Sequence, residues 1–424
     1  MIQKIFRSFA YIAGVFFLLM IINLVKGEQG YSAFFFTAGM AALAISFNGF
    51  VQLKGFAYTM WILVAISLGM LYPHSFIQWG DFELKRLIVP FVQVTMLGMG
   101  AQMKLDDFKG VIKMPKGVIT GVFCQFTVMP LVGFILSKVF HFPPEIAGGV
   151  VLIGCVPSAS ASNVMSYLAK ANLALAVTIG ATATLLAPFL TPQLMKLLGG
   201  QYVEVDVVGM MVDITNMIIV PIIAGFIFNL FYFNEKSTRS KLVQMGSFFS
   251  IILVTNLILH FSSEENTLSD SLYSLLMATT WFYLAPMIVA IILRHMKSIS
   301  YSTISSALAF IAMMGIVINT VIITASGQES LRQVGLLLIL SCFLHNIIGY
   351  TVGYTAAKLA KLPEKDRRTI AFEVGMQNGG VATGLALAMG KVATVGLASA
   401  IFGPLQNLTG SALVNIFKKR PVKE

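Results

Sequence analysis

A carboxylate, two side-chain amides and three glycines interrupt an apolar run at residues 372–381. The polar groups are Glu373, Gln377 and Asn378. A carboxylate at the centre of a bilayer costs about 2.5–3.5 kcal/mol on insertion scales, so Glu373 needs a partner if this run spans a membrane. No Lys or Arg lies in the neighbouring apolar runs. A bound cation is the simplest partner, because hard cations take oxygen ligands. The alternative is a protonated Glu373 that is bonded to helix backbone.

A second polar interruption lies at residues 149–164. An apolar half-helix runs into Pro157, which lacks a backbone N–H, and a Ser/Ala stretch ending in Asn163 follows. Irregular backbone at membrane depth is tolerated only where it is buried in protein or lines a polar cavity. Each interruption ends in an Asn and is followed by a small-residue half-helix and one more apolar run. Paired broken helices of this kind indicate the binding site of a transporter.

The composition requires lipid as the solvent for most of the chain. Of 424 residues, 57% are hydrophobic and only 11% are charged, whereas soluble domains carry about 25% charged residues. A soluble core of this length could not hide so much apolar surface. The basic residues that give the net charge of +11 flank the apolar runs. They form no cluster with interleaved aromatic residues, so nucleic-acid binding is not indicated.

Runs of about 20 apolar residues are long enough to span a bilayer as helices. Fourteen candidate spans lie near 5–25, 31–51, 56–73, 87–103, 117–137, 145–169, 172–195, 206–231, 242–262, 272–293, 302–326, 333–357, 369–390 and 393–417.

The basic residues support this count. With the N-terminus in the cytoplasm, 22 of the 29 Lys and Arg residues fall on the cytoplasmic side. The seven on the outer side are Lys26, Lys85, Arg86, Lys138, Lys196, Arg332 and Lys391. Loops rich in basic residues resist translocation, so this asymmetry predicts a multi-pass protein of the cell (inner) membrane with both termini cytoplasmic.

The predicted organisation is two repeats with two extra pairs of spans. Seven spans end by residue 195 and seven follow, and an odd number per repeat makes the repeats inverted. The predicted parts are 1–52 (two additional spans), 53–200 (first repeat, with the broken helix 145–169), 201–232 (start of the second repeat), 233–300 (additional spans) and 301–424 (rest of the second repeat, with the broken helix 369–390).

Several ordered motifs closely resemble the bile acid:sodium symporter family. They are Ala161-Ser162-Asn163-Val164-Met165-Ser166-Tyr167-Leu168-Ala169, Leu185-Leu186-Ala187-Pro188-Phe189-Leu190-Thr191-Pro192, Gln125-Phe126-Thr127-Val128-Met129-Pro130, Leu344-His345-Asn346-Ile347-Ile348-Gly349-Tyr350 and Ala371-Phe372-Glu373-Val374-Gly375-Met376-Gln377-Asn378. The resemblance implies an all-α polytopic membrane protein with panel and core domains, two crossing discontinuous helices and transport by alternating access. Family members usually have ten spans, so the spans near 5–51 and 242–293 are additional.

The resemblance also implies sodium sites. One site corresponds to the side chains of Gln125, Glu373 and Gln377 and the backbone carbonyls of Val374 and Met376. The other corresponds to Ser162, Asn163 and Glu373 with two hydroxyls from the next helix.

This chain departs from the family at those two hydroxyl positions. The aligned residues are Ala176 and Gly180, which have no side-chain oxygen, and Thr184 lies one turn beyond Gly180. We therefore expect one tightly bound Na⁺, with the second site in doubt.

The substrate of this family lies beside the crossover, where this chain places Ser158, Ser160, Asn163 and Asn378. Half-helix N-termini carry partial positive charge and free N–H groups, which favour an organic anion such as a carboxylate or a bile-acid-like molecule. The alternative for the serines is packing between helices. The predicted partners are this anion and the bilayer, with no nucleic acid, and the sequence leaves the oligomeric state open.

Three other functions would each use a different feature of the sequence. A metalloid or anion efflux carrier of the same superfamily would use Cys155, and a proton-coupled carrier would use Glu373. A sensor would need an appended signalling domain. An enzyme is not indicated, because metal-ligand spacings, a nucleophile elbow and a phosphate-binding glycine loop are lacking.

Overall fold

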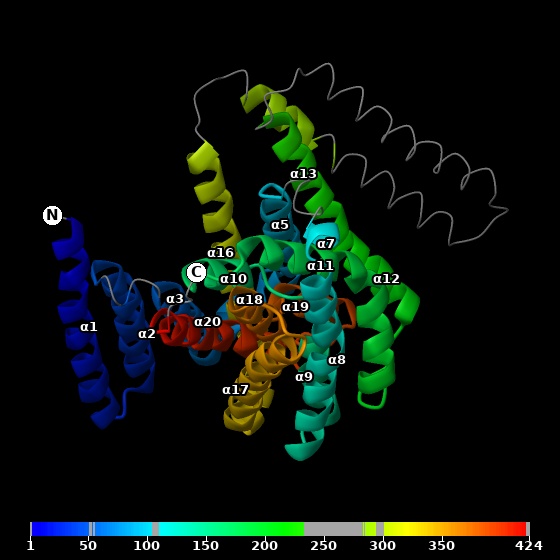
Figure 1. Cartoon of the computed structure of the whole chain (residues 1–424). Coiled ribbons are helices and arrows are strands. Elements are labelled where there is room, and N and C mark those ends of the chain that lie inside the picture. The colour runs from blue at the N-terminus through cyan, green and yellow to red at the C-terminus, as the bar shows by residue number, and fades with distance from the viewer. Residues whose placement is uncertain are drawn as a thin grey trace. The chain divides into compact units, whose positions relative to one another are not determined.

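The computed structural model describes residues 2–50, 53, 56–103, 110–232, 283, 285–293 and 301–420. Within these ranges the structure is helical apart from turns and one short hairpin, in which β1 (Gln78–Trp79) pairs antiparallel with β2 (Phe82–Glu83) (Figure 1). Helices predominate because a backbone in lipid must satisfy its own hydrogen bonds.

Seven helices in the described part of the chain are long and apolar enough to span a membrane. They are Gln3–Val25, Gln29–Gly49, Pro115–Val139, Leu173–Gly199, Val207–Tyr232, Ser306–Ser326 and Gln328–Leu359. The prediction of an α-helical, multi-pass membrane protein is therefore confirmed. The predicted span 242–262 lies outside the described residues, and of 272–293 only 283 and 285–293 are described, as helix. The count of fourteen stays a prediction.

The chain forms two compact units, of which the first comprises Met1–Val92, Asp106–Ile214 and Met313–Glu424. Its helical elements are α1 (Ile2–Val25), α2 (Gln29–Ser46), η1 (Phe47–Gly49), α3 (Ala57–Leu71), α4 (His74–Ile77), η3 (Leu84–Leu87), the start of α5 (Ile88–Gly100), α7 (Gly110–Lys113), α8 (Pro115–Val139), α9 (Pro144–Cys155), α10 (Ala161–Leu168), α11 (Leu173–Leu194), the π-helix η4 (Met195–Gly199), α12 (Val207–Ile214), part of α16 (Tyr301–Ser326), α17 (Gln328–Leu359), α18 (Glu364–Gly375), α19 (Gly379–Ala388) and α20 (Leu397–Lys418).

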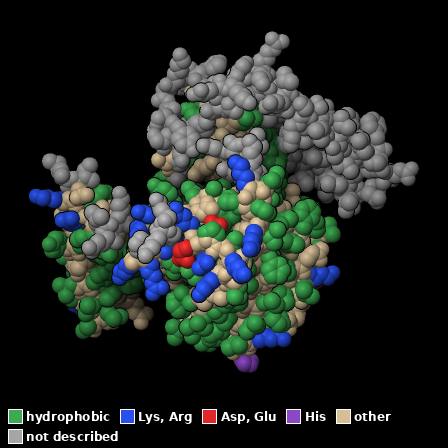
Figure 2. Space-filling view, in the orientation of Figure 1, with side chains coloured by type: hydrophobic (Ala, Val, Ile, Leu, Met, Phe, Trp, Pro, Cys, Tyr) green, Lys and Arg blue, Asp and Glu red, His purple; other side chains and the backbone are tan. Residues whose placement is uncertain are grey.

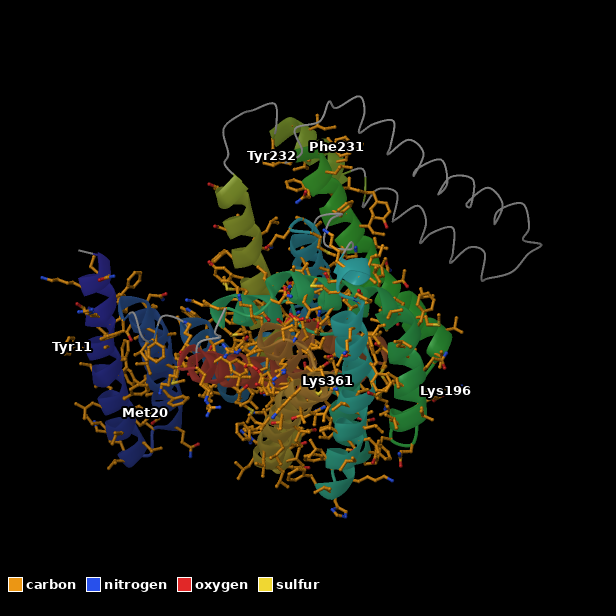
Figure 3. All side chains as sticks on the ribbon, in the orientation of Figure 1. Tyr11, Met20, Lys196, Phe231, Tyr232 and Lys361 are labelled. Atoms are coloured by element: carbon orange, nitrogen blue, oxygen red, sulfur yellow. The ribbon has the colours of Figure 1, made fainter. Side chains whose placement is uncertain are left out.

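The helices α1 and α2 form an antiparallel N-terminal hairpin (Figure 1). Gly39 makes the close contact possible, because a Cβ at this position would lie 2.9 Å from the Phe17 ring. Hydrophobic side chains cover most of the visible surface of this hairpin (Figure 2). Tyr11, which is 80% exposed, points outward from α1 (Figure 3). This apolar exposure suits a lipid-facing surface.

The second unit comprises Gln93–Leu105 and Thr215–Ala312. Its described elements include the π-helix η5 (Thr215–Ile219) and α13 (Val220–Tyr232), which ends at Phe231 and Tyr232 (Figure 3). Its core contains Ala224, Phe228, Phe231, Tyr283 and Ala290.

Close helix contacts hold α9 and α18 against α8 and α17. A Cβ on Gly154 of α9 would lie 2.4 Å from the Met129 carbonyl oxygen of α8, and one on Gly349 of α17 would lie 2.8 Å from Gly375 Cα of α18. The Nε2–H of His345, fully buried, donates to the same Met129 carbonyl at 2.9 Å. Small residues at these contacts are how membrane helices approach closely.

Candidate functional site

Two helix breaks lie against each other in the first unit. The first break separates α9 from α10 at residues 156–160, and the second separates α18 from α19 at residues 376–378. The Ala159 N–H donates to the Met376 carbonyl at 3.0 Å, and the Asn378 N–H donates to the Pro157 carbonyl at 2.9 Å. Each break thus supplies hydrogen-bond partners for the other, which is why non-helical backbone persists here.

Glu373 lies on the last turns of α18 and is fully buried. The Ser158 hydroxyl donates to Oε2 at 2.7 Å, and the Ser162 hydroxyl donates to Oε1 at 2.5 Å. The ion pairs among the described residues do not include Glu373. The structure therefore brings the carboxylate of the second break to the hydroxyls of the first, and in the described part of the chain it has no basic partner.

A second polar group of side chains surrounds Gln377. The Gln125 Nε2 of α8 donates to Gln377 Oε1 at 2.6 Å and to the Val156 carbonyl at 2.8 Å. The Gln377 Nε2 donates to the Val374 carbonyl at 2.8 Å. Gln125 and Gln377 are fully buried. The amides and the carbonyls of Val374 and Met376 thus lie around one break, and no hydrogen bond among the described residues joins them to the Glu373 carboxylate.

The other predicted sodium site has fewer side-chain oxygens. Asn163 has a buried Oδ1 without a hydrogen-bond partner. A Cβ on Gly180 of α11 would lie 3.5 Å from Glu373 Oε2 and 3.6 Å from Ser158 Oγ, so position 180 adjoins the carboxylate but offers no side-chain oxygen. Ala176 is fully buried, and the Thr184 hydroxyl donates to the Gly180 carbonyl at 2.7 Å.

The four residues assigned to substrate differ in availability. The Ser158 hydroxyl is committed to Glu373, and Asn378 caps α19 by accepting from the Val381 N–H at 3.2 Å. Ser160 is exposed at the N-cap position of α10, where its side chain makes no capping hydrogen bond. Among the described residues, the Ser160 hydroxyl and the Asn163 Oδ1 have no hydrogen-bond partner, and Asn378 uses its Oδ1 in the cap.

Polar residues that the sequence analysis did not assign support the second break. The Asn346 Nδ2 of α17 donates to the Gly375 carbonyl at 2.7 Å, and the Thr409 hydroxyl of α20 donates to Asn346 Oδ1. Gln406 of α20 bonds the backbone of Gln377. An amide in the middle of a membrane span was the available signal, because such groups are costly unless they are bonded.

Side-chain contacts also hold the first turns of the two broken helices, at the starts of α9 and α18. Beside α9, Glu145 pairs with Lys391 and accepts from the Thr394 hydroxyl at 2.6 Å. At the start of α18, the Asn172 Nδ2 donates to Asp366 Oδ1 at 2.8 Å. In both places the loop after one broken helix contacts the first turn of the other.

The first turns of α18 hold a buried arginine. Arg368 Nε donates to Glu364 Oε1 at 2.9 Å, and the guanidinium lies 4.8 Å from the centre of the Phe417 ring. Burial alone would raise the pKa of Glu364, but hydrogen bonds from Tyr354 and Arg368 outweigh it and hold that pKa below its ordinary value.

A buried carboxylate between paired helix breaks, in a polytopic helical protein, defines a secondary transporter site. The family model for the Sodium Bile acid symporter family matches residues 89–271. The chain is 32% identical over 370 residues to the uncharacterized sodium-dependent transporter YocS of Bacillus subtilis, an alignment that covers 87% of this chain and 93% of that protein.

Plant proteins are also similar. The probable chloroplastic sodium/metabolite cotransporter BASS1 of Arabidopsis thaliana is 27% identical over 383 residues, which cover 89% of this chain and 78% of that protein. The chain belongs to the sodium bile acid symporter family, so the predicted resemblance is confirmed. The family and these relatives indicate a transporter coupled to sodium.

Proposed function

We propose that this protein is a secondary active transporter that carries a small organic anion together with sodium by alternating access. The observation that carries the proposal is Glu373, which is fully buried between the hydroxyls of Ser158 and Ser162 with no basic partner in the described part of the chain. A cation supplies the missing positive charge. The printed names of the bacterial and plant relatives, which mention sodium and metabolite cotransport, support the proposal.

The proposed ion site uses the oxygens of Gln125, Glu373 and Gln377 with the Val374 and Met376 carbonyls. Sodium prefers such oxygens, and unwound carbonyls coordinate coupling ions in broken helices. Ser162 and Asn163 with Glu373 would begin a second site, but Ala176 and Gly180 contribute no oxygen to it. We therefore propose one tightly bound sodium ion.

One sodium ion has an energetic consequence. Its co-transport with a monovalent anion moves no net charge, so the membrane potential, worth about 2.3 kcal/mol per charge per 100 mV, does not drive uptake. A tenfold sodium gradient alone supplies about 1.4 kcal/mol, or roughly tenfold accumulation.

The proposed architecture is an inverted repeat of about 14 spans with two crossing discontinuous helices. Matching corners in the two halves support it. His141 and Lys361 have positive φ values of 50° and 55°, and each precedes by two residues the Pro at the N-cap of a broken helix. Lys361 is labelled in Figure 3. Lys170 and Gly390, with φ values of 53° and 69°, follow the second half of each broken helix. The domain boundaries predicted from the sequence fit this scheme, with both termini proposed to lie in the cytoplasm.

The proposed substrate site lies at the starts of α10 and α19, beside Ser158, Ser160, Asn163 and Asn378. Its most available polar side chains are Asn163, whose Oδ1 has no partner among the described residues, and Ser160, whose hydroxyl makes no capping hydrogen bond. Helix N-termini favour the carboxylate of an organic anion.

A proton-coupled carrier is the second candidate. Each Glu373 oxygen accepts one hydroxyl hydrogen bond, an arrangement that also accommodates a protonated carboxyl group. A metalloid efflux carrier is not supported, because the described residues place no cluster of three or more His, Cys, Asp or Glu side chains at Cys155.

Thermal unfolding of the purified protein tests the proposal. Small carboxylates are screened in NaCl and in KCl at matched ionic strength. We expect stabilisation by a carboxylate in NaCl and little in KCl. Equal stabilisation in the two salts, with a strong dependence on pH, would instead support proton coupling.

A further inference from the structure

The unwound segment between α18 and α19 is bonded along both of its edges. On one edge, the backbone of the first break pairs with it through Ala159 and Asn378. On the other edge lies Gln406, a residue of α20 that is 5% exposed. A backbone peptide at this depth cannot turn to water, so each edge needs a partner from the protein.

Gln406 bonds both polar backbone atoms of Gln377. The Gln377 N–H donates to Gln406 Oε1 at 2.7 Å, and Gln406 Nε2 donates to the Gln377 carbonyl at 3.0 Å. The side-chain amide therefore acts as a neighbouring strand would, with one donor and one acceptor matched to one peptide residue. This pairing fixes the backbone from which the Gln377 side chain reaches Gln125.

The backbone that carries Gln406 is itself held by α17. The Tyr350 hydroxyl donates to the Gln406 carbonyl at 3.2 Å, and Tyr350 is 5% exposed. Three residues further along α20, Thr409 donates to Asn346, which bonds the Gly375 carbonyl. The same face of α20 thus fixes residues 375 and 377, on either side of Met376.

We propose that Gln406 is a positioning residue that sets the sodium affinity of the site without itself being an ion ligand. The inference rests on the proposed function. It follows because the Met376 carbonyl and the Gln377 side chain, two of the proposed ligands, project from the short stretch of backbone that Gln406 holds. A ligand set held in place by a surrounding layer of hydrogen bonds loses affinity when that layer is removed.

The test compares sodium binding by the full-length protein with that of Gln406→Met, which keeps the side-chain length and loses both hydrogen bonds. Binding of radioactive sodium to the purified protein is measured by scintillation proximity. We expect the sodium dissociation constant to rise roughly tenfold to a hundredfold, as the loss of two buried hydrogen bonds implies. Gln406→Asn, whose amide is withdrawn by one methylene, gives an intermediate rise and serves if Gln406→Met does not fold.

A merely structural role would give a different result. It would lower the unfolding temperature equally in NaCl and KCl and leave the sodium dissociation constant unchanged. Gln333→Met, at an exposed position of α17, is the matched control and is expected to bind sodium as the wild type does.

Two failures are distinguishable. If folded Gln406→Met, or folded Gln406→Asn where Gln406→Met does not fold, binds sodium within twofold of the wild type, Gln406 has no positioning role. If the wild-type protein binds no sodium, the proposed function itself is wrong.

Discussion

The two helix breaks differ in how completely their polar groups are held. In the second break, Gly375, Met376 and Gln377 all have bonded backbone atoms, supplied by α17, α20 and the first break. The amide of Gln377 is in turn bonded to Gln125. These groups are held by hydrogen bonds within the protein itself.

The first break is supported more sparsely. Ser158 and Ser162 bond Glu373, but the Asn163 oxygen has no partner and Ser160 is exposed. Position 180, beside the carboxylate, is a glycine. We propose that the two breaks divide the work: the second break would hold the cation, and the first would keep free polar groups for a ligand of less fixed shape.

Glu373→Gln is the change with the largest expected effect on this comparison. The amide keeps the size and can still accept from a serine hydroxyl, but it removes the negative charge that both breaks share. We expect sodium affinity to fall at least roughly a hundredfold, because an ion loses its charged partner.

Sodium-dependent thermal stabilisation measures this effect. Glu329→Gln, at the start of α17, is the control for removal of a carboxylate. Sodium dependence of Glu373→Gln equal to that of the wild type would remove Glu373 from the ion site.

Ser162→Ala tests the contribution of the first break to the charged site. The hydroxyl lies 2.5 Å from Glu373 Oε1, and hydrogen bonds to charged groups contribute about 1.5–3 kcal/mol. We expect a roughly tenfold loss of sodium affinity in binding titrations. Ser166→Ala is the matched control, since that buried hydroxyl, one turn along α10, has no partner. A result in which both variants behave alike would mean that the Ser162 contact has no role in ion binding.

Gly180→Ser tests whether the second sodium site can be completed, because it adds a side-chain oxygen beside Glu373. A Cβ there meets Glu373 Oε2 at 3.5 Å and Ser158 Oγ at 3.6 Å, which is ordinary contact, so the added carbon fits. We expect the Hill coefficient of sodium binding to rise above one, and more so with Ala176→Ser added. Gly180→Ala, which adds the carbon alone, should leave the coefficient unchanged. A coefficient that stays near one in the double variant would show that missing oxygens are not the reason for a single site.

Lys391→Gln has the smallest expected effect. It breaks the pair between the first turn of α9 and the loop after α19, where the side chains of Lys391 and Glu145 are 34% and 40% exposed. Solvent-screened pairs of this kind contribute at most about 1 kcal/mol to the free energy of unfolding. Thermal unfolding should therefore shift little, and sodium affinity should not change. A tenfold loss of affinity would show that the helix ends, as well as Gln406, set the geometry of the break.

Much of the fold could be predicted from the sequence because its signals are local. Pro157, which lacks a backbone N–H, and the polar, glycine-rich stretch around Met376 mark positions where a helix is weakened, and the structure ends α9 at Cys155 and α18 at Gly375. Apolar run length predicted the spanning helices. The β1–β2 hairpin was not predicted, since it is two residues per strand and carries no periodic signal.

The site could be predicted only in part. Glu373 stood out because a charge in an apolar run is rare, and the family resemblance supplied Gln125, Gln377 and Ser162. Gln406 was missed because a single amide in a span has many uses. Its role depends on which backbone atoms lie beside it, and that is a property of helix packing rather than of local sequence.

The number of sodium ions bound per chain tests the account most directly. Equilibrium binding of radioactive sodium to the purified wild-type protein, without substrate, gives both stoichiometry and cooperativity. We predict one ion per chain and a Hill coefficient near one, with binding abolished in Glu373→Gln. Two ions per chain, or binding that survives in Glu373→Gln, would contradict this prediction.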